Sequence, residues 1–214
     1  MCRLLYVNSK EEFSIAEYLS KFSDISKNSK EFQGHGWGCA YLQGDERKYY
    51  KNVKPIWDCD FSQFGYSKRL IAHSRSAYRN EGIVVENNMP FYDKNYMFVF
   101  NGQLSGVKIK EEGRIGAEKI FNFIKRFDKG NLKNAIEKGT EIIKQKSSYI
   151  RAMNIIMANS ASAYLSSYFN EDQEYFTMYV KASNSSIVIC SDPFIGEEDW
   201  QRIENNSITE FKCF

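Results

Sequence analysis

The chain contains only three prolines, and it has no proline-, glycine- or serine-rich segment that could serve as a linker. It also contains no internal repeat and no low-complexity tract. Boundaries between domains usually fall in such segments. We therefore expect the 214 residues to form one domain, residues 1–214, which at this length can bury a large core without a disulfide or a structural metal.

Long apolar runs are also missing. Stretches such as YMFVF at 96–100 and SIVIC at 186–190 are far shorter than the roughly 20 residues of a membrane-spanning helix. The N-terminus lacks the basic segment, apolar run and cleavage site of an export signal. The five cysteines are an odd number without paired spacing, which favours reduced thiols. We predict a soluble cytoplasmic protein with no membrane partner.

An excess of charge of one sign is absent as well. The formal net charge is +2, and Lys and Arg are mixed with Asp and Glu along most of the chain. Nucleic-acid-binding proteins usually carry a clustered basic face, so we predict no nucleic-acid partner. The hydrophobic content of 43% and aromatic content of 15% are typical of a globular protein.

Short runs rich in β-branched and aromatic residues predict strands in two groups. The first group covers 2–7, 36–42, 48–53, 69–75 and 96–102, and the second covers 154–160, 163–169, 175–182, 186–192 and 208–214. The NEDQ segment at 170–173 predicts a hairpin turn between two strands of the second group.

Helical spacing of apolar residues predicts three helices, at 9–25, 117–127 and 132–143. The first has Ser9 as its N-cap and Glu12 three residues later, which is the pattern of a capping box. Because the other two lie between the two groups of strands, they must cover a sheet made of strands distant in sequence. The element order therefore predicts a layered α+β sandwich.

Cys2 is the first residue that could carry chemistry. An α-amino group and a thiol have pKa values of about 8 and 8.5, so removal of Met1 would give a nucleophile with a matched base on the same residue. The small size of cysteine favours removal of the preceding methionine. The alternative is that Cys2 is a buried packing residue at the start of an edge strand.

Two further motifs are suited to acyl transfer. Asn101 and Gly102, at the end of a predicted strand, offer a side-chain amide and an unobstructed backbone N–H to a developing oxyanion. Arg75, at the end of another strand, could hold a substrate carboxylate through two hydrogen bonds. The alternatives are a hairpin turn for the Asn-Gly pair and a structural ion pair for Arg75.

Taken in order, these motifs resemble those of the class II glutamine amidotransferases of the N-terminal-nucleophile hydrolase superfamily. They are MC at 1–2, GHGWGCAYL at 34–42, LIAHSRSA at 70–77, NNMPF at 87–91 and FVFNGQLSG at 98–106. GRIGAEKIF at 113–121 resembles the segment that opens a helix in that family, and SIVICSDPF at 186–194 resembles its late strand. The resemblance covers residues 2 to about 195 and implies a four-layer αββα sandwich, in agreement with the element order.

The resemblance also implies roles for individual residues. Cys2, after removal of Met1, corresponds to the nucleophile that attacks the glutamine side-chain amide, and Asn101 and Gly102 correspond to the oxyanion hole. Arg75 corresponds to the residue that holds the substrate α-carboxylate. Substrate-pocket positions also fall on the following residues: Ser76, Pro90 and Phe91.

One position departs from the family pattern. Gly116 stands where the family has an acidic residue that binds the α-amino group of glutamine. An ammonium left without its partner would cost roughly 1–3 kcal/mol, or one to two decades in kcat/KM. A γ-glutamyl compound or a substrate with a blocked amine is therefore an alternative to free glutamine. Ser76, Tyr78 and Arg79 also replace residue types usual in the synthase members.

No metal or cofactor is expected. His35 and Cys39 form a single ligand pair without a matching second pair, which is too little for a zinc site. Neither His35 nor His73 has the sequence context of a papain-like Cys–His pair. His73, inside an apolar strand, is expected to be a hydrogen-bonded structural residue.

Two functions follow from these observations. The first is a stand-alone amidohydrolase of the glutaminase type, which acts on a small-molecule amide and either passes ammonia to a separate synthetase subunit or performs hydrolysis for its own sake. The second is a regulatory or binding subunit that keeps the fold without turnover. Gly116 favours it, and the joint presence of Cys2, Arg75, Asn101 and Gly102 opposes it. A homo-oligomer is left open.

Overall fold

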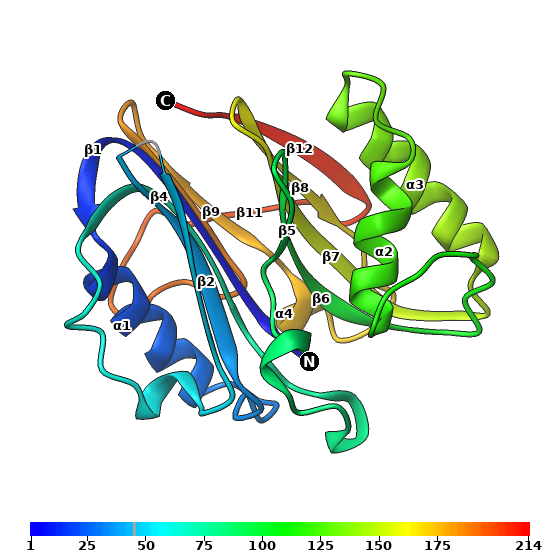
Figure 1. Cartoon of the computed structure of the whole chain (residues 1–214), viewed down its shortest axis with the longest axis horizontal. Helices are drawn as coiled ribbons and strands as arrows, with labels where there is room; N and C mark the ends of the chain where they lie inside the picture. Colours follow the sequence, from blue (N-terminus) through cyan, green and yellow to red (C-terminus); the bar gives the residue numbers. More distant parts are fainter. Residues whose placement is uncertain (45) are drawn as a thin grey trace.

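Two antiparallel sheets lie face to face between two helical layers in the computed structural model, which describes residues 1–44 and 46–214 (Figure 1). Helix α1 (Ile15–Lys27) covers the outer face of one sheet, and α2 (Gly116–Lys125) and α3 (Leu132–Lys146) cover the outer face of the other. The layers therefore follow the order αββα. The α+β sandwich predicted from the element order is confirmed.

The first sheet has seven strands in the order β11-β9-β10-β1-β4-β2-β3. Strand β1 is central, between β10 and β4, and not an edge strand. The bounds are β1 Arg3–Ser14, β2 Trp37–Gln43, β3 Glu46–Asn52, β4 Tyr66–Ser74, β9 Tyr179–Ala182, β10 Ser186–Cys190 and β11 Gln201–Arg202.

The second sheet has five strands in the order β12-β8-β7-β6-β5. Its bounds are β5 Phe91–Tyr92, β6 Met97–Ser105, β7 Tyr149–Ala158, β8 Ser162–Ser167 and β12 Ser207–Lys212. The remaining elements are short: α4 Gln173–Phe176 and three 3-10 turns at Ile56–Asp58, Tyr78–Asn80 and Val85–Asn87.

Alternation along the strands assigns side chains to layers. Leu4, Tyr6 and Ile71 of the first sheet belong to the core that continues through the second sheet to α2 and α3. Leu5 and Leu70 point the other way, into the core beneath α1. Even-numbered residues at the start of β1 therefore face the space between the two sheets.

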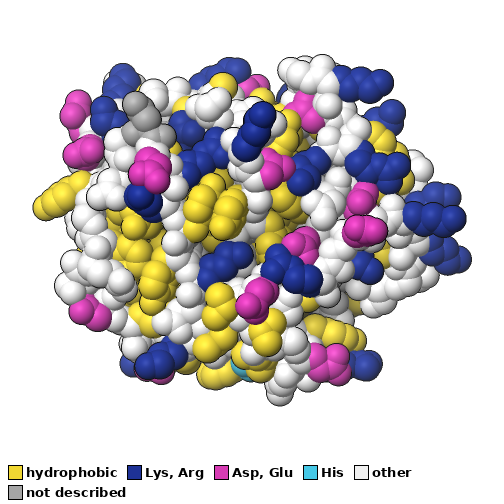
Figure 2. All heavy atoms as spheres, in the orientation of Figure 1, with side chains coloured by type: hydrophobic (Ala, Val, Ile, Leu, Met, Phe, Trp, Pro, Cys, Tyr) yellow, Lys and Arg dark blue, Asp and Glu magenta, His cyan; other side chains and the backbone are white. Residues whose placement is uncertain are grey.

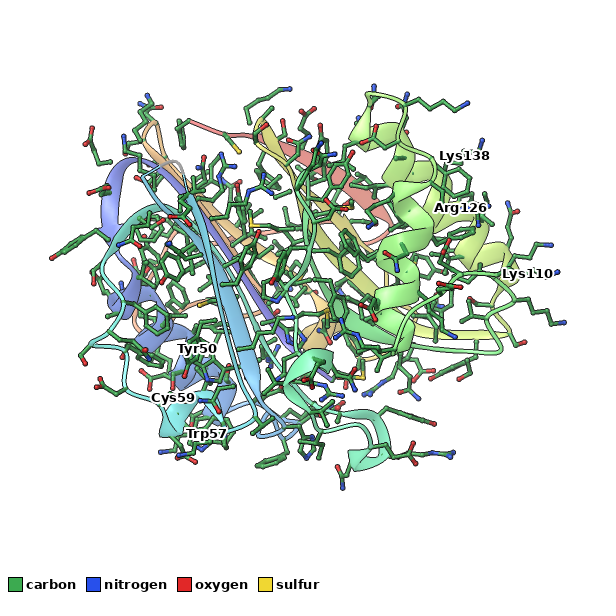
Figure 3. The ribbon with its side chains drawn as sticks, in the orientation of Figure 1. Tyr50, Trp57, Cys59, Lys110, Arg126 and Lys138 are labelled. Carbon is green, nitrogen blue, oxygen red and sulfur yellow. The ribbon has the colours of Figure 1, made fainter. Side chains whose placement is uncertain are left out.

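The outer core beneath α1 is rich in aromatic side chains. Trp37 is fully buried, and its indole donates to Cys59 Sγ at 3.2 Å. Figure 3 shows Trp57, Cys59 and Tyr50 together at this side of the molecule. This layer explains the aromatic content without any ligand.

Two expectations about secondary structure are wrong. The helix expected from Ser9 begins at Ile15, with Ser14 as its N-cap, because residues up to Ser14 pair with β4. The hairpin expected at 170–173 does not form, because the chain crosses from β8 in the second sheet through α4 to β9 in the first.

Charges of both signs are interspersed over most of the face shown in Figure 2. Lysine and arginine side chains project outward on the α2–α3 side, where Figure 3 labels Lys110, Arg126 and Lys138. None of the helices in the described part of the chain is long and apolar enough to cross a membrane.

Candidate active site

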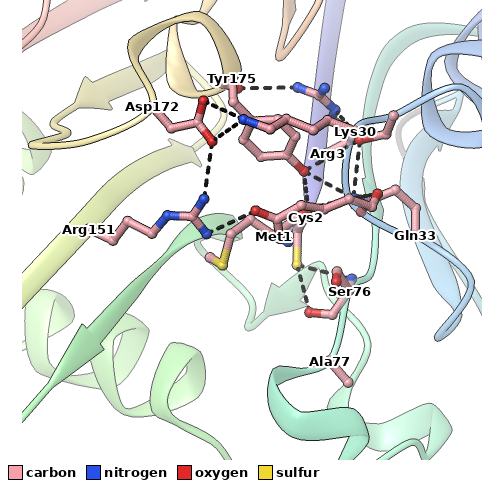
Figure 4. A network of polar contacts seen from close by, with 12 residues as sticks. Met1, Cys2, Arg3, Lys30, Gln33, Ser76, Ala77, Arg151, Asp172 and Tyr175 are labelled. Atoms are coloured by element: carbon pink, nitrogen blue, oxygen red, sulfur yellow. Dashed lines mark hydrogen bonds and ion pairs between the residues drawn. The ribbon is translucent and has the colours of Figure 1, made fainter.

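Cys2 lies immediately before β1, buried at 8% exposure, with its thiol beside the segment that follows β4 (Figure 4). The Ser76 backbone N–H donates to Cys2 Sγ at 3.5 Å, and the thiol lies 3.7 Å from the Ser76 carbonyl oxygen. Burial raises the pKa of the Cys2 thiol, although the N-terminal ammonium, the Ser76 N–H and the Arg75 charge oppose the shift. A buried thiol of this kind needs a base to become a nucleophile.

Met1 is held at both of its backbone polar groups. Its ammonium forms an ion pair with Glu31 Oε2, and its carbonyl oxygen accepts from Gln33 Nε2 and from the Tyr175 hydroxyl, each at 2.5 Å. Its side chain packs against the Met1 cluster, defined here as Ala152, Phe169, Tyr175 and Phe176. In this form of the protein the Cys2 nitrogen is an amide and has no basic lone pair.

A chain of charged residues holds Glu31 in place, and Figure 4 labels three of its members, Arg151, Asp172 and Lys30. Arg151 donates to Glu31 Oε1 at 2.9 Å and to Asp172 Oδ2 at 3.1 Å, and Lys30 binds the same Asp172 carboxylate at 2.9 Å. Burial favours the neutral form of Glu31, but the N-terminal ammonium and Arg151 together hold its pKa below its usual value. The carboxylate is therefore ionised at neutral pH.

Arg75 is buried at 6% exposure directly after β4. Its guanidinium donates to the backbone carbonyls of Gly82 at 2.8 Å and Glu81 at 3.4 Å. Among residues 1–44 and 46–214, no carboxylate pairs with it, so the structural ion pair considered above is not formed there. Burial lowers the pKa of Arg75, and the neighbouring Cys2 thiol opposes that shift. A buried guanidinium without a counter-charge is suited to an anionic ligand.

Asn101 and Gly102 lie inside β6, where they pair with Asn154 and Met153 of β7. The hairpin-turn interpretation of this pair is therefore wrong. Asn101 is fully buried, and neither polar atom of its amide has a hydrogen-bond partner in the described part of the chain. A side chain at position 102 would collide with the Ala152 carbonyl oxygen, at 2.1 Å from an ideal Cβ, so this position requires glycine.

The Asn101 side chain faces the first sheet. Phe98 packs on Phe121 of α2 with ring centroids 5.2 Å apart, so by alternation Asn101 points to the opposite side, into the space between the sheets. Cys2 lies two residues before Leu4, so by the same alternation its side chain points into the same space. Contacts between β1 and β6 and between β4 and β6 bridge it.

Two neighbouring carbonyls of α4 connect the surroundings of Cys2 and Asn101. Arg3, next to Cys2, donates to the Tyr175 carbonyl at 3.3 Å. Asn154, directly opposite Asn101 on β7, donates to the Phe176 carbonyl at 2.7 Å. By strand alternation Cys2 and Asn101 face the same inter-sheet space, and the Arg75 charge lies close enough to the Cys2 thiol to oppose the rise in its pKa.

The remaining predicted substrate residues divide between two places. Ser76 touches the Cys2 thiol through its backbone. Pro90 and Phe91 are buried at the edge of the second sheet, where Lys51 Nζ lies 5.3 Å and the Arg114 guanidinium 5.6 Å from the Phe91 ring centroid. Phe91 therefore contacts cations, and its neighbourhood differs from that of Cys2.

Gly116 is exposed at the first position of α2, and a Cβ built there would meet nothing within 4 Å. Packing therefore does not require glycine at this position. Glu118, two residues on, is bound by Arg114 through contacts of 2.5–2.9 Å, so its carboxylate is already paired.

The expectation for His73 is wrong. The side chain is fully buried, and neither ring nitrogen has a hydrogen-bond partner in residues 1–44 and 46–214. Burial, reinforced by the charges of Arg75 and Lys51, lowers its pKa well below the usual value, so the ring is neutral. His35 accepts a hydrogen bond from the Ala77 N–H at 2.9 Å. Within the described chain, no three His, Cys, Asp or Glu side chains group as metal ligands.

Two hollows lie away from Cys2. One of about 410 Å³ lies between α3 and the β8–β12 edge, and one of about 260 Å³ lies beside α4.

Sequence reasoning missed Glu31, Gln33, Arg151 and Tyr175, which surround Met1. They come from the segment after α1, from β7 and from α4, and none of them belongs to a local motif. Pairing between β1 and β4 and the crossing of α4 toward the first sheet bring them together. Only a three-dimensional arrangement could identify them.

Comparison with known proteins bears on the fold. No family model matches the chain. A Haemophilus influenzae protein named "Putative glutamine amidotransferase" is 22% identical, and the match covers 99% of this chain and 84% of that protein.

Two solved structures share the fold. The glutamine phosphoribosylpyrophosphate amidotransferase of B. subtilis, complexed with ADP and GMP, matches with a TM-score of 0.71 and 14% identity over 99% of this chain. This chain spans 47% of that protein. A glutamine aminotransferase class-II domain protein from Silicibacter pomeroyi matches with a TM-score of 0.61 and 14% identity, over 99% of both chains.

These matches confirm the resemblance to class II glutamine amidotransferases that the sequence motifs indicated. The chain has the N-terminal-nucleophile hydrolase fold of those domains.

Proposed function

We propose that this chain, as one domain over residues 1–214, is an amidohydrolase in which Cys2, freed of Met1, attacks the side-chain amide of glutamine or of a γ-glutamyl compound. One observation carries the proposal. In the described part of the chain, the Asn101 amide is buried without a hydrogen-bond partner, and the Arg75 guanidinium, whose charge acts on the Cys2 thiol, is buried without a carboxylate partner.

Removal of Met1 would change the chemistry of Cys2 itself. The amide nitrogen would become a primary amine, whose pKa of about 8 matches that of a thiol. This amine would accept the thiol proton as Sγ attacks the amide carbon, and it would then deliver that proton to the leaving nitrogen. The base is needed because burial raises the pKa of the thiol.

Arg75 and Asn101 would supply binding and transition-state stabilisation. The Arg75 guanidinium, fixed by the carbonyls of residues 81 and 82, would hold the substrate carboxylate. The Asn101 amide and the Gly102 N–H would stabilise the oxyanion of the tetrahedral intermediate. A single donor of this kind contributes roughly a hundred- to a thousandfold in kcat.

Water would then hydrolyse the thioester on Cys2 and release the acid. The nitrogen product, ammonia or an amine, would either be used by a separate synthetase or be released. Because Gly116 provides no carboxylate for an α-ammonium group, γ-glutamyl compounds and substrates with a blocked amine belong to the proposed substrate range together with free glutamine.

Labelling tests the nucleophile. Intact mass should show loss of Met1, and a glutamine-like diazo-ketone should add to Cys2 alone. The adduct should disappear in Cys2→Ala and persist in Cys213→Ala, which removes a half-buried thiol elsewhere. Retention of Met1 on all molecules, or labelling that survives Cys2→Ala, would contradict the proposal.

A non-catalytic binding subunit is the second candidate. It is favoured by Gly116, because that position offers no carboxylate to a substrate ammonium. Ammonia release from glutamine and from γ-glutamyl amides separates the two candidates. If the trimmed protein, which lacks Met1, binds these compounds without releasing ammonia or an amine, it is the binding subunit.

A further inference from the structure

Met1 occupies a site built for a primary ammonium with an apolar substituent. Its ammonium binds Glu31 Oε2, and its side chain lies against the Met1 cluster of Ala152, Phe169, Tyr175 and Phe176. The side chain of Met1 is only 13% exposed, and Tyr175 and Phe176 are buried at 4% and 0%. When Met1 leaves, these groups face the space it occupied.

That space begins next to the reacting atoms. A single residue's backbone separates the Met1 nitrogen from the Cys2 nitrogen, which corresponds to about 3 Å. In the proposed reaction the Cys2 amine must reach the leaving nitrogen within hydrogen-bond distance, roughly 2.6–3.2 Å, to deliver its proton. The Met1 ammonium therefore lies at about the distance from the Cys2 nitrogen at which a leaving nitrogen could receive its proton.

Glu31 remains in position after Met1 is removed. Arg151 binds its other oxygen, Oε1, at 2.9 Å, and Asp172 holds Arg151 at 3.1 Å. Oε2 then has no partner from Met1 and becomes available to an ammonium. The carboxylate keeps its geometry because its fixing contact does not involve Met1.

We infer that the space occupied by Met1 becomes the leaving-group subsite once Met1 is removed. In this subsite Glu31 Oε2 accepts a hydrogen bond from the nitrogen released from the substrate, and the Met1 cluster packs against the apolar substituent of that nitrogen. This inference rests on the proposed function and specifies its substrate class. The class is secondary amides of the γ-glutamyl type, whose amine part carries an unbranched apolar chain about as long as a methionine side chain.

The chemistry balances with the groups present. The Sγ–carbon bond forms, the carbon–nitrogen amide bond breaks, and the thiol proton passes through the Cys2 amine to the leaving amine. That amine takes up one further proton from water, and the alkylammonium pairs with Glu31. Water then cleaves the thioester and restores the thiol.

Binding of n-butylammonium to the trimmed protein tests this subsite without turnover. We expect calorimetric binding to the trimmed protein and none to the form that retains Met1. Glu31→Gln should weaken this binding roughly tenfold or more, the effect of losing one charged hydrogen bond. Glu171→Gln is the matched control, because Glu171 also lies near Arg151, at 3.9 Å, but does not contact Met1.

Turnover provides the second readout. Glu31→Gln should lower kcat/KM for both γ-glutamyl-n-butylamide and glutamine, because Glu31 would bind the nitrogen released from either, and Glu171→Gln should change neither. The ratio of kcat/KM for the butylamide to that for glutamine should fall in Phe169→Ala, which removes part of the Met1 cluster. An unchanged ratio in Phe169→Ala would overturn the inference, as would butylammonium binding that is unaffected by the presence of Met1 or by Glu31→Gln. If the protein loses Met1 and is labelled at Cys2 but binds no alkylammonium, this inference fails and the proposed function stands. If Cys2 is never labelled, the proposed function fails.

Discussion

At the scale of residues, Asn101 and Asn154 stand directly opposite each other on β6 and β7 and face the same layer. Both polar atoms of the Asn154 amide have partners: its nitrogen donates to the Phe176 carbonyl at 2.7 Å, and its oxygen accepts from the Tyr168 N–H at 3.1 Å. The Asn101 amide has neither contact in the described structure. A buried polar group without a partner costs about 1–3 kcal/mol, so Asn101 is poorly explained by stability.

The two residues should therefore respond in opposite ways to truncation. Asn101→Ala should lower kcat roughly a hundredfold or more while leaving the free energy of unfolding nearly unchanged. Asn154→Ala should lower the free energy of unfolding by about 1–3 kcal/mol, because it leaves buried partners unpaired. Urea unfolding and steady-state kinetics on both variants check this. A large loss in the free energy of unfolding for Asn101→Ala would show that Asn101 stabilises the fold, which would contradict the catalytic role proposed for it.

His73 predicts a dependence of stability on pH. Its folded-state pKa lies well below the usual value, first through burial and then through Arg75 and Lys51. The unfolded chain binds a proton at this histidine below about pH 6.5 and the folded chain does not. Stability should therefore fall as the pH drops below 6.5, by about 1.4 kcal/mol per pH unit from this residue.

His73→Gln should remove that part of the acid slope of the unfolding free energy between about pH 6.5 and 5. The chain has one other histidine, so His35→Gln is the natural control, and its half-buried ring should leave the His73 contribution intact. If His73→Gln fails to fold, NMR titration of the unchanged protein gives the answer. A His73 ring that titrates near pH 6.5 would refute the assignment.

At the scale of elements, the start of α1 shows where local pattern and tertiary pairing compete. Ser9 and Glu12 have the spacing of a capping box, yet the strand continues to Ser14, whose register with Tyr66 closes the β1–β4 pairing after an irregularity between Asn8 and Phe13. Ser14 Oγ then accepts from the Glu17 N–H at 3.3 Å. Pairing with β4 therefore decides where the helix begins.

Ser14→Ala should lower the free energy of unfolding by about 1 kcal/mol, the usual cost of losing an N-cap. Ser9→Ala should change it by less than about 0.5 kcal/mol, because Ser9 forms only a local exposed contact with the Glu11 N–H. Chemical denaturation of the two variants compares them directly. Equal losses would mean that the helix extends back to Ser9 in solution.

The sequence predicted the elements whose pattern is local and repeated. The apolar periods of α2 and α3, the apolar run of β4 and the aromatic run of β6 identified the layers. The MC, LIAHSR and FNG motifs indicated Cys2, Arg75 and Asn101. The α4 crossing escaped prediction because its residues alternate like a strand. The Glu31–Met1 contact could not be predicted from local pattern, because it depends on which sheet each segment of the chain joins.

At the scale of the whole molecule, Met1 joins the two sheets. It precedes β1 of the first sheet, while its side chain packs on Ala152 of β7 in the second, and Glu31 connects its ammonium to Arg151 of β7. A mature enzyme that lacks Met1 would give up these contacts where the sheets meet. Such a loss is common at functional sites, where stability is exchanged for activity.

The trimmed form should therefore be less stable than the form that retains Met1, by roughly 1.5–3 kcal/mol from the buried methionine side chain.

The difference in the free energy of unfolding between the two forms should shrink as the pH falls. The lowered pKa of Glu31 means that its pairing stabilises the protein above its usual pKa of about 4.5 and is lost as the carboxylate takes up a proton below it. Urea unfolding of the two forms, separated by mass, at pH 7 and pH 4 measures both effects. In Glu31→Gln the pH-dependent part of the difference should vanish, whereas a trimmed form as stable as the untrimmed one would show that Met1 does not tie the sheets together.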